Sequence, residues 1–94
     1  MNTLIERHYK AVKKRGFITE STTLEAFMSK IEEEYLELWN AYADAVQNDD
    51  KCPDNDMIHE AIDLMAVITN MLHFYGVNVS REFQKNINYQ RSRI

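Results

Sequence analysis

The chain has 94 residues and a net charge of −4, with 45% apolar and 28% charged residues, as is typical of a soluble globular protein. We expect one domain over residues 1–94. The scarcity of glycine and proline argues against a turn-rich β fold, no stretch approaches the roughly 20 apolar residues of a membrane span, and the negative charge disfavours a nucleic-acid-binding protein.

The N-terminus, MNTLIERHYK, lacks the apolar segment of a secretory signal. Cys52 is the only cysteine, so no disulfide can form within the chain. Both features favour a cytoplasmic protein.

Hydrophobic spacing predicts helices along most of the chain. The first runs from about Thr3 to Arg15 and ends at Gly16. The second begins at TTLE, where Thr22 and Glu25 have the spacing of a capping box, and it continues to about Val46. Its helical period is carried by Leu24, Phe27, Met28, Ile31, Tyr35, Leu38, Tyr42 and Ala45.

The polar segment 47–55 contains Pro53 and predicts a loop. A third helix begins near residues 54–56 and ends at Gly76. Asn78 is a suitable N-cap for a fourth helix, on which we expect Phe83 and Ile87 to face inward. Four helices with short connections predict an all-α four-helix bundle. Because so short a chain buries little surface, apolar helices of this kind favour an oligomer.

Carboxylates interrupt the apolar pattern of the second helix. In EEEYLEL, Glu34 and Glu37 are three residues apart and therefore lie on nearly one side of the helix. Glu34 falls between Ile31 and Leu38 on the inward-facing stripe. Glu32, by contrast, is expected to be solvated.

The third helix shows a similar interruption. In EAIDLMAVITNML, residues 61–68 are apolar except for Asp63, which we expect to be buried. Glu60 lies one turn before it, and Asn70 lies two turns after it on the same side. An unpaired buried charge costs several kcal/mol, so Asp63 needs either a Lys or Arg from another helix or a bound cation.

Antiparallel packing of the second and third helices would bring the two acidic pairs together. Four carboxylates at close range repel one another unless some are protonated or cations lie between them. Mg²⁺ prefers oxygen ligands and retains waters that substrate phosphates can replace. The spacing therefore predicts a metal site formed by Glu34, Glu37, Glu60 and Asp63.

EEYLEL followed by EAID resembles the EExxE…ExxD signature of the MazG-like all-α nucleoside triphosphate pyrophosphohydrolases. The segment DLMAVITNMLHFYGVNVSREFQKN is similar to that family's third helix, turn and fourth helix. Lys85, Asn88 and Arg91 resemble its phosphate-contacting KxxNxxR segment. The resemblance covers about Thr22 to Arg91.

The resemblance implies a function and an assembly. The substrate would be a nucleoside triphosphate, hydrolysed to the monophosphate and pyrophosphate by a homodimer or homotetramer. Glu33 would orient or deprotonate the attacking water, and the cofactor would be Mg²⁺, with Mn²⁺ as an alternative. The implied metal ligands are Glu34, Glu37, Glu60 and Asp63. The implied contacts to the substrate phosphates are Lys85, Asn88 and Arg91.

Base recognition and substrate identity stay open at this point. Asn70 and Trp39 are candidates to line a pocket, although aromatic residues at helical spacing are more often core. His59 is expected at the surface. The alternatives are a phosphoribosyl-ATP pyrophosphohydrolase, a dimeric dUTPase, which usually has additional helices, and a non-catalytic helical oligomeric adaptor.

Overall fold

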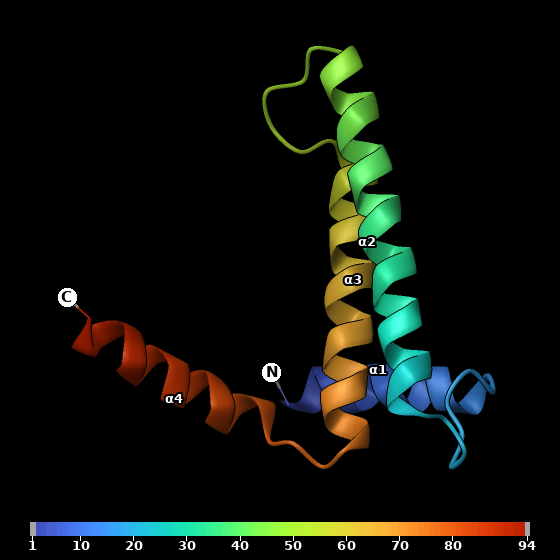
Figure 1. Ribbon diagram of the computed structural model, residues 1–94, viewed down its shortest axis with the longest axis vertical. Helices are drawn as coiled ribbons and strands as arrows, with labels where there is room; N and C mark the ends of the chain where they lie inside the picture. Colours follow the sequence, from blue (N-terminus) through green and yellow to red (C-terminus); the bar gives the residue numbers. More distant parts are fainter. Residues whose placement is uncertain (1, 94) are drawn as a thin grey trace. The chain divides into compact units, whose positions relative to one another are not determined.

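The computed structural model describes residues 2–93, in which the regular structure consists of four helices and no strand. The helices are α1 (Asn2–Lys14), α2 (Leu24–Gln47), α3 (Asn55–Phe74) and α4 (Val79–Ser92) (Figure 1). The all-α prediction is confirmed, and the helix ends lie within about two residues of their predicted positions. Within this range no helix combines the length and the apolar character that crossing a membrane requires.

The start of α2 differs from the prediction by one residue. The N-cap is Thr23, whose Oγ1 accepts a hydrogen bond from the backbone N–H of Ala26 at 3.1 Å. Thr22, predicted as the cap because Glu25 follows three residues later, lies before it. Either threonine can cap a helix, and the backbone enters the helix only at Leu24.

The two later helices begin with side-chain caps of the same kind. Asp54 Oδ1 accepts from the backbone N–H of Met57 at 2.9 Å at the start of α3. Asn78 Oδ1 accepts from the N–H of Arg81 at 3.0 Å, which confirms the predicted cap of α4. Gly76, with φ at +75°, supplies the left-handed turn between the end of α3 and the start of α4.

The described chain divides into two compact units, one of which is Ser21–Ile68. In this unit α2 and most of α3 lie side by side and antiparallel, as an α2–α3 hairpin (Figure 1). Phe27, Glu34 and Ala41 are buried on α2. Because they are seven residues apart, they form one stripe facing inward. The inward position predicted for Glu34 is confirmed.

The other unit consists of Met1–Glu20 and Thr69–Ile94. Its buried apolar residues are Ile5, Ile18 and Val79. Asn70 is also buried, and its side-chain amide contacts His8 Nδ1, with distances of 3.2 and 3.3 Å from its nitrogen and oxygen. A buried amide needs such a partner because an unmet hydrogen bond is costly.

The prediction that Phe83 and Ile87 face inward is wrong. Their exposed fractions are 50% and 43%, and Val79 is the only residue of α4 that is buried among those described. The apolar face of α4 is narrow because most of its other residues are polar. Among the described residues, burial on α4 is confined to its first turn, so Phe83 and Ile87, about one and two turns later, lie beyond the packed region.

Candidate metal centre

Three carboxylates converge on one side of the α2–α3 hairpin. Glu34 and Glu37 come from α2 and Glu60 from α3, and one carboxylate oxygen of each lies within 4.8 Å of the others. The three-residue spacing on α2 places two acids on one side of that helix, and antiparallel packing supplies the third. The predicted meeting of the two acidic pairs is therefore confirmed for these three residues.

Glu34 is the buried member of this group, with an exposed fraction of 7%. Its Oε1 accepts from Lys30 Nζ at 3.1 Å. Its Oε2 is buried, and so is Oε2 of Glu60, and no hydrogen-bond donor among residues 2–93 contacts either atom. Ionised carboxylates are acceptors only, so neighbouring acids cannot satisfy these oxygens unless one of them carries a proton.

The pKa of Glu37 is raised by the neighbouring carboxylates. Its side-chain hydrogen bond to Glu34 and the charge of Glu34 raise the pKa of Glu37 to about 7, and Glu60 contributes in the same direction. The hydrogen bond, which only a protonated Glu37 can donate, and the like-charge repulsion both favour its neutral form. A proton on Glu37 and a bound cation are thus two ways of relieving the same repulsion.

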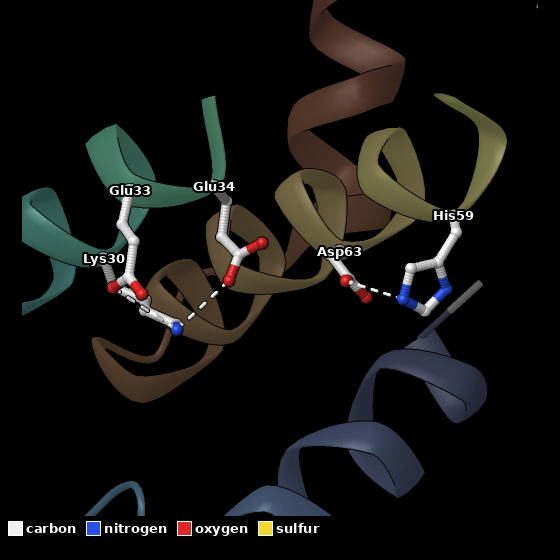
Figure 2. Close-up of polar contacts among 5 residues, drawn as sticks. All are labelled: Lys30, Glu33, Glu34, His59 and Asp63. Carbon is white, nitrogen blue, oxygen red and sulfur yellow. Dashed lines mark ion pairs between the residues drawn. The ribbon is translucent and has the colours of Figure 1, made fainter. Parts of the chain in front are cut away.

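Asp63 extends the group along α3. His59, Glu60 and Asp63 also offer ligand atoms within 4.8 Å of one another, and Asp63 Oδ2 lies 3.2 Å from His59 Nε2 (Figure 2). The side chain of Asp63 is 41% exposed, so the prediction that it is buried is wrong. The rotation of α3 about its axis places Asp63 at the edge of the hairpin. The acid that the hairpin buries is Glu34.

The ionic partner of Asp63 comes from its own helix. A Lys or Arg from another helix was the alternative left open by the sequence. In the described structure Asp63 contacts His59, four residues earlier, and this contact is an ion pair when the imidazole is protonated. His59 is a surface residue, as expected, with its side chain 72% exposed. Its closeness to the carboxylates was not predicted, although the four-residue spacing to Asp63 was a usable signal.

Glu33 lies beside the buried acid and remains exposed. Lys30 Nζ is 3.4 Å from Glu33 Oε2 and 3.1 Å from Glu34 Oε1, so one ammonium group contacts both carboxylates (Figure 2). The hydrogen bond to Glu34 raises the pKa of Lys30 above its usual value. Sequence reasoning missed Lys30, for which the signal was its position four residues before Glu34.

The predicted phosphate contacts belong to the other unit. On α4, Lys85 Nζ lies 3.4 Å from Glu82 Oε1, and Asn88 Oδ1 accepts from Gln84 Nε2 at 3.1 Å. Arg91 is exposed near the end of the same helix. Their role in substrate binding stays a prediction.

Neither of the two candidate pocket residues belongs to the acidic groups found among the described residues. Trp39 is 56% exposed and its ring lies 5.3 Å from that of Tyr42. Five residues separate it from Glu34, which is about 140° around the helix, so its side chain leaves the acidic side. Asn70 is buried in the other unit against His8.

The donor atoms indicate which cation suits the site. Glu34, Glu37 and Glu60 offer only oxygen, the donor preferred by Mg²⁺. The group containing His59 adds an imidazole nitrogen, which favours Mn²⁺ or a similar transition metal over Mg²⁺. The buried Oε2 of Glu34, which no hydrogen-bond donor among the described residues contacts, is the feature that fits a cation best.

Comparison of the chain with protein-family models, with curated proteins and with solved structures found no match. Function must therefore be argued from the carboxylates and their surroundings.

Proposed function

We propose that the protein is a Mg²⁺-dependent cytoplasmic hydrolase that converts a nucleoside triphosphate into the monophosphate and pyrophosphate. The observation that carries the proposal is the buried Oε2 of Glu34, which has no hydrogen-bond donor among residues 2–93 and belongs to a side chain that meets Glu37 and Glu60. The order EExxE then ExxD, which resembles the MazG-like pyrophosphohydrolases, supports the choice of substrate class.

In this proposal Glu34, Glu37 and Glu60 hold the cation, and Asp63 completes the set from the next turn of α3. When bound, Mg²⁺ neutralises charge on the triphosphate and so lowers the barrier to displacement at phosphorus. Glu34 is fixed in place by burial, and its Oε1 pairs with Lys30 in the metal-free chain. A fixed ligand lowers the ordering cost of binding.

Glu33 is the proposed general base. Its side chain is 58% exposed, so water can reach it, and it directly precedes the buried ligand Glu34 on α2. It would take a proton from water while the water oxygen bonds to the α-phosphorus and the bond to the leaving pyrophosphate breaks. Lys30 holds the Glu33 carboxylate near Glu34 through the 3.4 Å ion pair.

Lys85, Asn88 and Arg91 are the proposed contacts to the outer phosphate oxygens. They recur every third residue on α4, so they lie close to one face of that helix. The guanidinium of Arg91 offers two parallel donors, a geometry that matches phosphate oxygens.

A nucleotide screen tests the proposal. The common NTPs and dNTPs are incubated with the full chain and Mg²⁺, and pyrophosphate and orthophosphate are measured separately. We expect pyrophosphate from at least one nucleotide, and none after EDTA or in Glu34→Gln.

Glu32→Gln is the matched control, because it removes the same charge from an exposed position of α2 outside the acidic group. It should retain activity. Orthophosphate as the product, or no turnover of any nucleotide, would contradict the proposal.

A further inference from the structure

Charge is divided unevenly between the two compact units of the chain. The unit formed by Met1–Glu20 and Thr69–Ile94 contains nine of the eleven Lys and Arg residues and three of the fifteen Asp and Glu residues, a formal charge of +6. The unit Ser21–Ile68 contains the other two basic and twelve acidic residues, a charge of −10. The net charge of −4 therefore conceals a basic unit that can attract an anionic partner.

Most basic residues of this unit belong to α1 and the residue that follows it. They are Arg7, Lys10, Lys13, Lys14 and Arg15. All five are exposed, and Glu6 is the only acid in the sequence of residues 2–17. The ion pairs among the described residues involve Lys30, His59 and Lys85. None of the five basic residues is therefore paired with a carboxylate in the part of the chain that the structure describes.

Three of these residues form a row on the solvent side of α1. They are Arg7, Lys10 and Lys14, which we call the basic stripe. Steps of three and four residues place side chains on one side of a helix. The opposite side of α1 packs within the unit, where Ile5 is buried and the ring of Tyr9 lies 4.5 Å from that of His73. Each residue of the stripe is about 140° or more around α1 from Ile5, so the stripe is free to contact a partner.

The two most exposed large apolar side chains among the described residues flank this stripe in the sequence. Leu4 and Phe17 are each 67% exposed, whereas the others do not exceed 56%. Leu4 precedes Arg7 by three residues and therefore lies on nearly the same side of α1. Phe17 follows the end of α1, and the guanidinium carbon of Arg15 lies 4.9 Å from the centre of its ring. Each end of the stripe thus combines an apolar group with a cation.

An anionic lipid surface has the chemistry that matches this combination. Its headgroups attract Lys and Arg, and the boundary between headgroups and acyl chains accepts apolar side chains. The apolar stems of Lys and Arg can lie in the same boundary while their charges stay among the headgroups. Nucleic acid would also attract the cations, but its phosphates offer no favourable contact to an exposed Leu4.

We propose that α1 is a peripheral membrane-docking helix, which binds anionic phospholipid through the basic stripe while Leu4 and Phe17 enter the headgroup region. The helix lies on the surface, since its other side stays packed through Ile5. The same lipid charge repels the unit Ser21–Ile68, whose charge is −10. Attachment of this kind is reversible and sensitive to salt. The proposal goes beyond the hydrolase function and depends neither on catalysis nor on a bound metal.

Sedimentation with lipid vesicles tests the proposal on the full chain. EDTA is present, so that divalent cations cannot bridge the acidic residues to the lipid. The vesicles contain either phosphatidylcholine with phosphatidylserine or phosphatidylcholine alone. We expect binding to the first kind only, and a loss of binding as the salt concentration rises, because salt screens the attraction. Absence of binding to phosphatidylserine vesicles at low salt, or equal binding to both kinds, would overturn the proposal.

Paired charge variants locate the contact. Lys10→Gln with Lys14→Gln removes two charges from the stripe, and Lys51→Gln with Arg93→Gln removes two from exposed positions outside α1. One basic residue near an anionic surface strengthens binding about fivefold, so the first double variant should bind phosphatidylserine vesicles about 25-fold more weakly. The second should stay within about twofold of wild type. An equal loss in both would show attraction by net charge alone and would overturn the assignment to α1.

Paired apolar variants distinguish lipid from nucleic acid. Leu4→Ser with Phe17→Ser removes the two flanking groups, and Phe83→Ser with Ile87→Ser removes a matched pair that is about half exposed on α4. Circular dichroism checks that both remain helical. We expect the first double variant to bind phosphatidylserine vesicles about tenfold more weakly, and the second to bind as wild type does. Equal vesicle binding by the two would overturn the proposal. Binding to a short DNA duplex that the first pair leaves unchanged would then assign α1 to nucleic acid.

Discussion

The two sides of the α2–α3 hairpin differ in what they leave unsatisfied. On one side, three carboxylates meet, and two of them have a buried oxygen that no hydrogen-bond donor among the described residues contacts. On the other, about 100° or more around each helix from the acids, large apolar side chains remain about half exposed, among them Tyr35, Trp39, Ile62 and Met65. The same two helices with the same periodicity thus present surfaces that call for different partners.

The difference shows how interaction range sets the size of a binding surface. Charge acts strongly over a few ångströms where water is excluded, so three or four residues can define a cation site. Apolar contact contributes only about 25 cal/mol per Å², so a stable association has to gather many side chains. Substitutions on the acidic side test this contrast, because each should change cation binding while leaving the apolar side intact.

Glu34→Gln should have the largest effect. It removes a charge from the buried ligand, and we expect the affinity for Mg²⁺ and Mn²⁺ to fall about 100-fold or more, since even outer-shell changes at metal sites cost 10–100-fold. Titration calorimetry measures this directly. Glu32→Gln should bind as the wild type does, and the molar mass of both variants should be unchanged. If Glu34→Gln bound the two cations with wild-type affinity, Glu34 would be excluded as a ligand of the metal site.

Asp63→Asn should have a smaller effect on affinity, about tenfold, because the residue is at the edge of the group. Its ion pair with His59 spans one helical turn at the surface and contributes about 0.5 kcal/mol or less. The melting temperature in EDTA should therefore change by no more than about 4 °C, while the stabilisation by Mg²⁺ decreases. A variant that melts far below wild type in EDTA would show that Asp63 has a structural partner.

Lys30→Met should increase the affinity for the cation, whereas the two substitutions above should decrease it. The ammonium of Lys30 neutralises Glu34 in the metal-free chain, so its removal should strengthen cation binding several-fold. The metal-free chain should be destabilised by about 1–2 kcal/mol, because a buried carboxylate loses its partner. Lys30→Arg preserves the charge and should match wild type. Weaker cation binding in Lys30→Met would mean that Lys30 supports the site rather than competing with the cation.

The smallest effect should be a pH dependence of the metal-free chain. Because the pKa of Glu37 is raised to about 7 from 4.5, the folded chain retains a proton that the unfolded chain releases between these values. Its contribution to stability is therefore present at low pH and is lost as pH rises through this window. Melts in EDTA across this range measure it, and Glu37→Gln should flatten the profile. Addition of Mg²⁺ should also flatten it, since the cation replaces the proton.

Helical spacing was sufficient to predict much of the acidic site. The pairs Glu34 with Glu37 and Glu60 with Asp63 are visible as three-residue steps, and the inward position of Glu34 follows from Ile31 and Leu38 on either side. Lys30 and His59 were missed as members because four-residue ion pairs are common on helix surfaces and carry little specificity.

The sequence by itself determined the four helices, the cap at Asn78 and the side of each helix on which the acids lie, because these depend on local hydrogen bonds and on helical period. Only the tertiary structure decided how α3 is rotated against α2. That rotation encloses Glu34, leaves Asp63 at the edge beside His59, and brings Glu60 to Glu37. It is set by side-chain packing between two helices, a non-local property that the period of either helix leaves undetermined.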